Sequence, residues 1–376
     1  MVIGDWLLVK GYFIIAGEAS GDLHAAELIT QIRQREPEAR ITGLGGDRMA
    51  AAGCYLYQDY RKMAFNGFIS VMAHSRQIHE NFRIAREALL KERPNALILI
   101  DYPSFNLQMA KFCRKHLPDT KIIYYIPPKV WAWKRRRVHA IARLCDEVLG
   151  IFPFEPPFYA KYGYQCTYVG NPTAEEISKG EWLKMKGERD QLIALLPGSR
   201  RTEIVSSLPR MLEAAHAYPD YRIVVTAAPG VEDDFYAPYL KLGETLTRDT
   251  YATVRSARAA IVNSGTATLE TALLGCPQVV VYHARPAWLI GLLRWAQPLL
   301  FTVRWFTLAN IIVDNEVVIE CIAKEFTVEK VGTELGRLLT DEAYRKEMLA
   351  AYEHLSSVLG TSAASAKAAE IITSKP

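Results

Sequence analysis

The sequence predicts an α/β protein built on two doubly wound parallel sheets, and three observations support this fold class. Short β-branched or apolar runs alternate with helical stretches along the chain. The runs are followed by Gly, Pro or Ser before the next helical stretch begins. A Val-Gly-Asn-Pro turn at 169–172 and a polar stretch rich in Lys and Glu then divide the runs into two series. We therefore expect two Rossmann-like domains that face a cleft, with ligands at the carboxyl ends of the strands.

The expected strands define these two domains. The first series covers 12–16, 40–44, 96–100, 121–126, 147–152 and 167–169, and the second covers 192–196, 222–226, 259–262 and 278–282. We place the N-terminal domain at 1–170 and the second domain at 171–344. The Ala-rich tail is expected to be helical, and its segment 345–376 to pack back onto the first domain.

Composition excludes several classes of protein. The chain has 376 residues, of which 50% are hydrophobic and 23% charged, as in an ordinary globular protein. A disordered, collagen-like or disulfide-stapled small protein is therefore excluded. The six cysteines form no C-x-x-C motif and no His/Cys cluster. They predict buried or free thiols in a reducing compartment, and no structural zinc.

Positive charge is concentrated in the first half of the chain. The net charge is +4, but residues 1–170 contain 23 Lys and Arg against 16 Asp and Glu, whereas 171–376 contain 22 against 25. This modest excess fits an anionic substrate or an anionic membrane surface better than nucleic acid. Residues 1–10 lack the basic segment of a signal peptide. The apolar window 288–306 contains Arg294, Pro298 and Arg304, which favours an interfacial segment or a buried hairpin over a spanning helix.

Two loops that follow expected strands of the first domain could carry chemistry. In AGEASGD (16–22), Gly17 and Gly21 allow close backbone approach, and Ser20 or Asp22 could cap the next helix and expose its amides to an anion. The alternative is a plain capped turn. Asp101 ends the apolar run ALILI, where partial burial would raise its pKa toward that of a general acid or base. The alternatives for this carboxylate are a helix N-cap and a structural salt bridge.

Two loops of the second domain have the features of an anion site. LPGSR (196–200) ends a strand and presents Arg200 at a helix start, where a guanidinium and backbone amides could grip a diphosphate. The alternative is a turn with exposed arginines. The second loop places Ser264, Gly265 and Thr266 at the start of a helix. Glu270 lies about two turns into that helix and could hold a ribose diol.

Other nucleotide and metal motifs are absent from the sequence. Residues 43–48 begin like a dinucleotide fingerprint, but Arg48 stands where its third glycine would lie. The motifs H-E-x-x-H, G-x-S-x-G and G-x-x-x-x-G-K-[ST] do not occur. Asp233 and Asp234 are adjacent rather than spaced as metal ligands, so no metal site is predicted.

Six motifs in this order and at these spacings resemble lipid-A-disaccharide synthases, a family of inverting GT-B glycosyltransferases (family 19). They are AGEASGD (16–22), Asp-x-Pro-x-Phe-Asn (101–106), VWAW (130–133), LPGSR (196–200), SGTATLE (264–270) and Leu-Ala-Asn (308–310). The resemblance runs from about residue 12 to the end of the chain. It implies that a UDP-2,3-diacylglucosamine donor is joined to 2,3-diacylglucosamine 1-phosphate. The products would be UDP and the β-1,6-linked disaccharide of lipid A.

The resemblance also implies roles for particular residues. Asp101 matches the family's proposed general base, Arg200 the contact to the UDP phosphates, and Glu18 the acidic residue of the first loop. Ser264, Gly265, Thr266, Glu270 and Asn310 match the nucleotide site, and Ser20 is expected to bind substrate with them. No metal and no cofactor are implied. The sequence departs from the family pattern at Pro127, usually Ser, at Ala309, often Pro, and at residues 1–10, which have no counterpart.

Acyl chains and a membrane would need apolar surface. The resemblance implies peripheral binding at the cytoplasmic face of the inner membrane, and it admits a homodimer. Phe65, Phe68, Ile69 and Met72 would share one helical face. Trp131 and Trp133 precede the basic run 134–137, a pairing suited to anionic headgroups. The alternative for each group is core packing or a solvated charge run.

Two other functions remain open from the sequence. The first is another UDP-sugar enzyme of the GT-B fold, of the peptidoglycan N-acetylglucosaminyltransferase or UDP-GlcNAc 2-epimerase type. The second is a nucleotide-sugar-binding module without catalysis, which would bind UDP without turnover.

Overall fold

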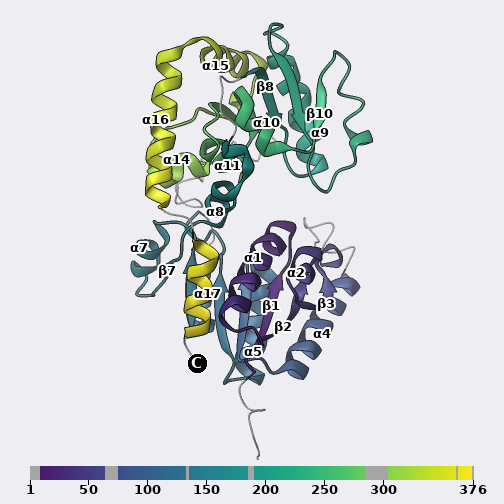
Figure 1. Ribbon diagram of the computed structural model, residues 1–376, viewed down its shortest axis with the longest axis vertical. Helices are drawn as coiled ribbons and strands as arrows, with labels where there is room; N and C mark the ends of the chain where they lie inside the picture. Colours follow the sequence, from purple (N-terminus) through teal and green to yellow (C-terminus); the bar gives the residue numbers. More distant parts are fainter. Residues whose placement is uncertain are drawn as a thin grey trace, which may run out of the picture. The chain divides into compact units, whose positions relative to one another are not determined.

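The computed structural model describes residues 9–63, 75–132, 135–184, 190–283, 304–360 and 363–374. The chain forms two compact units, Met1–Pro172 with Ser362–Pro376, and Thr173–Thr361 (Figure 1). Each unit contains one sheet, and all strand pairs in both sheets are parallel. The predicted fold class, two doubly wound parallel sheets, is confirmed.

The first unit has a seven-stranded sheet in the order β3-β2-β1-β4-β5-β6-β7. Its strands are β1 (Gly11–Ala16), β2 (Arg40–Gly45), β3 (Tyr55–Asp59), β4 (Ala96–Ile100), β5 (Lys121–Tyr125), β6 (Glu147–Gly150) and β7 (Thr167–Tyr168). Its helices are α1 (Ala19–Arg35), α2 (Asp47–Ala51), α4 (Ser75–Glu92), α5 (Pro103–His116), α6 (Arg137–Leu144), α7 (Glu155–Ala160) and α17 (Ala364–Ser374). The order reverses between β1 and β4, which puts the loops after these two strands at the topological switch point.

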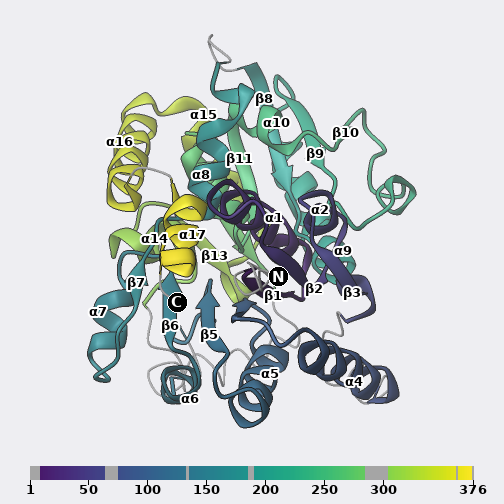
Figure 2. The same ribbon diagram turned by 60° about the horizontal axis from the view of Figure 1, so that its bottom comes forward.

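Alternating side chains of β1 show how this sheet is covered on both faces. Tyr12, Ile14 and Ala16 pack with α1 and α17, whereas Phe13 and Ile15 pack with α4 and α5. Figure 2 shows α1 and α17 on one face of this sheet and α4 and α5 on the other. Successive residues of a strand point to opposite faces, so a strand buried on both faces must be apolar throughout. This explains why the run GYFIIA could be identified as a strand from sequence.

The second unit has a six-stranded sheet in the order β10-β9-β8-β11-β12-β13. Its strands are β8 (Asp190–Leu196), β9 (Arg222–Thr226), β10 (Thr245–Thr247), β11 (Ala257–Asn263), β12 (Gln278–Tyr282) and β13 (Glu320–Ile322). Its helices are α8 (Pro172–Lys179), α9 (Arg201–Ala215), α10 (Thr250–Ser256), α11 (Ala267–Leu273), α14 (Leu308–Val313), α15 (Val328–Thr340) and α16 (Glu342–Leu359). The strand order repeats that of the first six strands of the first unit, with the reversal between β8 and β11.

The C-terminal segment differs from its expected form. Instead of one element over 345–376 that packs on the first domain, α16 belongs to the second unit and α17 to the first. The break falls at Gly360, whose φ of +70° is a conformation that glycine adopts without strain. The division between the units lies after Pro172, two residues beyond the expected boundary.

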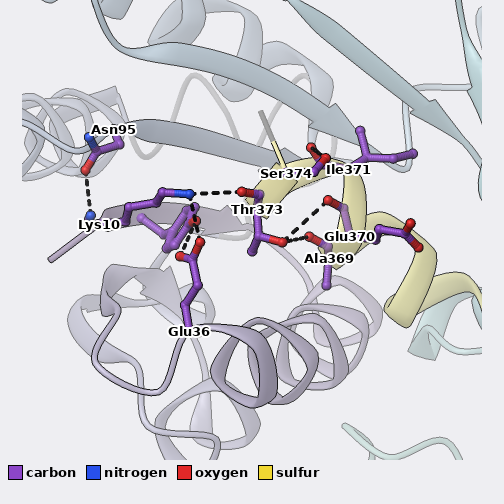
Figure 3. A network of polar contacts seen from close by, with 10 residues as sticks. Lys10, Glu36, Asn95, Ala369, Glu370, Ile371, Thr373 and Ser374 are labelled. Carbon is purple, nitrogen blue, oxygen red and sulfur yellow. Dashed lines mark hydrogen bonds and ion pairs between the residues drawn. The ribbon is translucent and has the colours of Figure 1, made fainter. Parts of the chain in front are cut away.

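Polar contacts fix α17 beside the start of β1 (Figure 3). The Lys10 ammonium donates to Glu36 Oε1 at 2.8 Å and to the Thr373 carbonyl at 2.9 Å. The Tyr12 hydroxyl donates to Glu36 Oε2 at 2.7 Å, and the Gly11 amide donates to Asn95 Oδ1 at 2.7 Å. Both ends of the described chain are therefore held at the amino edge of the first sheet.

The structure gives no support for a spanning helix in the part of the chain it describes, where no helix is long and apolar enough to cross a membrane. Residues 284–303, most of the apolar window 288–306, lie outside the described residues.

Candidate active site

The loops after β1 and β4 meet at the carboxyl edge of the first sheet. The Tyr102 ring lies over Gly17, where an added Cβ would approach the ring to 2.3 Å. Glycine is therefore needed at this position. The Tyr102 hydroxyl donates to the Met63 carbonyl at 2.6 Å. Burial raises the pKa of Tyr102, and the nearby Glu18 carboxylate raises it further. Glu18 therefore lies close to the loop that carries Asp101 and Tyr102, as expected for loops that follow adjacent parallel strands.

Capping in the first loop differs from the sequence expectation. Glu18 is the N-cap of α1 but makes no capping hydrogen bond with its side chain, and Ser20 lies exposed in the first turn. Asp22 is buried and caps α2 instead, since its carboxylate accepts from the amides of Gly46 at 2.7 Å and Met49 at 3.1 Å. Asp22 is therefore a structural residue that joins the loops after β1 and β2.

Asp101 follows β4, whose five residues are all buried. Burial raises the pKa of its carboxyl, while the Lys129 ammonium and a hydrogen bond from the Tyr102 backbone act in the opposite direction. The predicted environment of this carboxylate is confirmed. A half-buried carboxylate with a raised pKa is, once ionised, a stronger proton acceptor than an exposed one.

Lys129 and Glu155 are additions to the site that the sequence reasoning missed. Glu155 is 1% exposed and accepts from the amides of Ile151 at 2.7 Å and Phe152 at 2.9 Å. Burial raises the pKa of Glu155 to about 7, although these hydrogen bonds and the positive charge of Lys129 act to lower it. Lys129 was detectable as the lone cation inside the apolar run 122–133. Glu155 carried no such signal.

Trp131 is a core residue, which corrects its expected role at a membrane surface. Its ring is 3% exposed, packs edge-on against Phe152 and Phe154, and donates from Nε1 to Glu155 Oε1 at 3.2 Å. The indole thus fixes the segment after β5 to the turn after β6. Phe65, Phe68, Ile69, Met72 and Trp133, the other residues of that prediction, lie outside the described residues.

In the second unit, the turn after β8 presents Arg200 as the N-cap of α9. Its guanidinium is exposed and lies 3.3 Å from Glu203 Oε1, and the Ser199 amide donates to Glu203 Oε2 at 2.9 Å. Gly198 has a φ of +120°, and a Cβ there would approach Glu203 Oε2 to 2.6 Å. The Glu203 carboxylate therefore occupies the helix N-terminus, where an anion would be stabilised.

The neighbouring turn, after β11, carries Ser264, Gly265 and Thr266. Gly265 and Thr266 are exposed, Ser264 is half-buried, and Thr266 is the N-cap of α11. Glu270 lies in the first turn of this helix, not about two turns into it as expected. Burial, with a smaller contribution from Glu176, raises its pKa to about 7. Because β8 and β11 are adjacent parallel strands, their turns lie at the same edge of the sheet, as the nucleotide-site prediction requires.

Asn310 is not free to bind a nucleotide, and this corrects its expected role. It is 0% exposed, and its amide donates to the Val318 carbonyl at 2.9 Å and to Glu320 Oε1 at 3.1 Å. Its Oδ1 accepts from the amides of Val317 at 2.8 Å and Val318 at 2.9 Å. All four hydrogen-bonding positions of the side chain are used within the protein. Asn310 therefore fastens α14 to the chain before β13.

Across the described ranges, no group of three or more His, Cys, Asp or Glu residues is arranged to hold a metal ion. The chemistry available at the two edges is a partly desolvated carboxylate in the first unit, and a guanidinium with a carboxylate of raised pKa in the second.

Comparison with solved structures identifies the fold. A kitacinnamycin glycosyltransferase matches with a TM-score of 0.61 and 15% identity, over 96% of this chain and 98% of its own. A UDP-GlcNAc 2-epimerase of Methanocaldococcus jannaschii, solved with UDP-GlcNAc and UDP, matches with a TM-score of 0.62 and 11% identity, over 97% and 100%. These similarities show the GT-B fold.

Comparison of sequences identifies the family. The lipid-A-disaccharide synthase of Geobacter sulfurreducens is 36% identical over 373 residues, covering 96% of this chain and 95% of that protein. The synthase of Myxococcus xanthus is 35% identical over 374 residues, covering 96% of each. The family profile described as lipid-A-disaccharide synthetase matches residues 12–372. The chain therefore belongs to the lipid-A-disaccharide synthase family of glycosyltransferases.

Proposed function

We propose that this chain transfers the sugar of UDP-2,3-diacylglucosamine to the 6-hydroxyl of 2,3-diacylglucosamine 1-phosphate. Family membership supports the reaction class, the formation of the lipid A disaccharide. The observation that carries the catalytic part of the proposal is the partly desolvated Asp101 carboxylate at the switch point of the first sheet. Arg200, exposed at the start of α9, supports a role of the second unit in holding the donor diphosphate.

The proposed reaction is a single inverting displacement. The acceptor oxygen attacks the anomeric carbon while the bond to the diphosphate breaks, through an oxocarbenium-like state. Asp101 accepts the proton of the attacking hydroxyl, and UDP leaves with the bonding electron pair. Arg200 stabilises the charge that develops on the diphosphate, and Glu203 must release the guanidinium when this anion binds. Glu270 is proposed to hold the ribose hydroxyls, with Ser264, Gly265 and Thr266 beside the phosphates, and Glu18 and Ser20 to contact the acceptor.

We expect Asp101→Asn to lower kcat by ~10²–10⁴-fold, the usual contribution of a general base. The variant keeps the shape of the side chain, and its affinity for UDP should stay unchanged because Arg200 belongs to the other unit. The measurement is disaccharide formation from both acylated substrates, with UDP binding followed by calorimetry. Arg200→Ala is the matched control, in which affinity for UDP falls while Asp101 is intact.

The same assay separates the other functions. UDP release that does not need the acylated acceptor would favour an epimerase-type reaction, and UDP binding without turnover would favour a non-catalytic module. Near-normal turnover of Asp101→Asn would end the base assignment.

The proposal also places the protein as a peripheral protein on the cytoplasmic face of the inner membrane. The excess of positive charge in the first half of the sequence and the acylated substrates support this location. A homodimer stays a prediction from the family resemblance alone.

A further inference from the structure

The turn that carries Asp101 is strained. Among the described residues, six other than glycine have a positive φ, and three of them lie at the ends of β4 and β5: Asp101 (+44°), Tyr102 (+44°) and Ile126 (+60°). The left-handed region is tolerated by Asp but is costly for Tyr and for β-branched Ile. Such strain costs roughly 1–3 kcal/mol per residue and persists only where the surroundings impose it.

The fold itself does not require this strain. In the same sheet, the chain leaves β1, β2 and β6 without a non-glycine residue of positive φ in the turn that follows. A turn that follows a strand of this sheet can therefore form without a non-glycine residue in the left-handed region. The strain at β4 and β5 coincides with the candidate base, and backbone strain of this kind clusters at functional sites.

Two fully buried side chains hold the strained turn. Asn106, in the first turn of α5, donates from Nδ2 to the Ile100 carbonyl at 3.1 Å and to the Asp101 carbonyl at 2.7 Å. Tyr124, in β5, donates from its hydroxyl to the same Asp101 carbonyl at 2.6 Å. The Asp101 carbonyl thus accepts two side-chain hydrogen bonds, which use both of its lone pairs.

Backbone hydrogen bonds complete the frame around this turn. The Asp101 amide donates to the carbonyl of the strained Ile126 at 3.2 Å, and the Asn106 amide donates to the Tyr102 carbonyl at 3.1 Å. The position of the Asp101 main chain is therefore fixed from α5, from β5 and from the turn after β5.

We propose that Asn106 and Tyr124 are positioning residues that hold Asp101 in its strained conformation and thereby aim its carboxylate at the acceptor hydroxyl. The inference rests on the proposed role of Asp101 as the base. A base must lie within about 3 Å of the proton it takes, and a displacement of ~1 Å can lower the rate ~10²-fold. Without the tethers, residues 101 and 102 would relax toward an ordinary backbone conformation and carry the carboxylate away.

Tyr124→Phe tests the proposal, with Tyr12→Phe as its matched control. Both tyrosines are buried in the same sheet, and the hydroxyl of each donates one hydrogen bond in this structure, Tyr124 to Asp101 and Tyr12 to Glu36 near the opposite edge. We expect Tyr124→Phe to lower kcat ~10-fold or more at unchanged KM. Tyr12→Phe should leave kcat within about twofold, although each variant loses one part-buried hydrogen bond and a similar amount of stability. Equal kcat values in the two variants would overturn the proposal.

A double-mutant cycle excludes a merely structural effect. If Tyr124 acts through the Asp101 carboxylate, adding Tyr124→Phe to Asp101→Asn lowers kcat no further, because the base is already absent. A full additional loss would overturn the proposal while leaving the base assignment intact. By contrast, near-normal turnover of Asp101→Asn itself would reject the proposed function, so the two failures are distinguishable.

Asn106→Leu provides a second variant, in which a neutral side chain of similar size lacks both N–H donors to the carbonyls and adds no charge beside Asp101. We expect the same loss of kcat, together with a lower apparent pKa on the acid limb of the pH–rate profile, since a released Asp101 carboxylate is better hydrated. An unchanged pH profile in both variants would also contradict the inference.

Discussion

Two carboxylates at the carboxyl edge of the first sheet, Asp101 and Glu155, share a raised pKa but differ in burial and in hydrogen bonding. Asp101 and Glu155 both have a raised pKa because each loses water, and Lys129 opposes the shift in both. Glu155 is the more deeply buried of the two, and its oxygens accept hydrogen bonds from two amides and from Trp131. Glu155 therefore holds the segment that carries Lys129, whereas Asp101 faces the substrate in the proposed reaction.

The Glu155 carboxyl should make the stability of the first unit depend on pH. Its pKa is about 7 in the folded protein against 4.5 without the fold, so the folded state binds the proton more tightly. This contribution to the free energy of unfolding is complete at acidic pH and is lost as the pH rises through about 7. The shift corresponds to roughly 3 kcal/mol. Hydrogen exchange of α1 amides at several pH values in this range measures the change.

Glu155→Gln removes the titrating group and should flatten this pH dependence in the first unit. Glu270→Gln is the control, since Glu270 has a similar pKa but belongs to the second unit and should change only the exchange of α9. A wild-type first unit whose stability does not fall between pH ~5 and ~8 would contradict the assignment.

Individual residues show what sequence can predict about a site and where it fails. The environment of Asp101 was predictable because a run of five apolar residues implies a strand buried on both faces, and a carboxylate at its end must be partly desolvated. Asn310 and Trp131 match family motifs, but their partners Val318 and Glu155 lie 8 and 24 residues away in sequence. A motif does not reveal that a side chain is already saturated by such partners.

At the scale of elements, the strands missed from sequence are the edges of the sheets. β3, β10 and β13 all include polar residues, and each has a neighbour on one side only. β10 and β13 are also short, with three residues each. An edge strand can face water, so it lacks the continuous apolar run that identified the central strands. The division of the tail into α16 and α17 was missed for another reason, because the only local signal was Gly360 in an otherwise Ala-rich helical sequence.

The short helix α17 should be required for the stability of the first unit although it is distant in sequence. Ile372 is 2% exposed and packs in the core with α1, so Ile372→Ala should lower the free energy of unfolding by about 2–5 kcal/mol. Hydrogen exchange should show lost protection in α1 and none in α9. Ile371→Ala, at the half-buried neighbouring position, is the control and should cost less. Wild-type protection of α1 in Ile372→Ala would show that α17 contributes little.

At the scale of the whole molecule, charge is divided between the two units. The first unit, which includes the tail from Ser362, contains 25 Lys and Arg against 17 Asp and Glu, a net charge of +8. The second contains 20 against 24, a net charge of −4. The unit proposed to bind the acylated acceptor is therefore the one that an anionic membrane would attract.

Vesicle binding should reveal this asymmetry. We expect the protein to sediment with vesicles that contain phosphatidylglycerol and not with vesicles of phosphatidylcholine alone. Each basic side chain near the surface contributes about 1 kcal/mol, so the double variant Arg135→Gln/Arg136→Gln should bind ~30-fold more weakly. Both arginines are exposed beside the loop after β5.

The control Lys241→Gln/Lys324→Gln removes two exposed charges from the second unit and should bind like the wild type. Binding that survives about 1 M salt, where the screening length falls to ~3 Å, would show that apolar insertion rather than charge holds the protein at the membrane. Equal losses in the two double variants would show that net charge alone, and not the face formed by the first unit, determines binding.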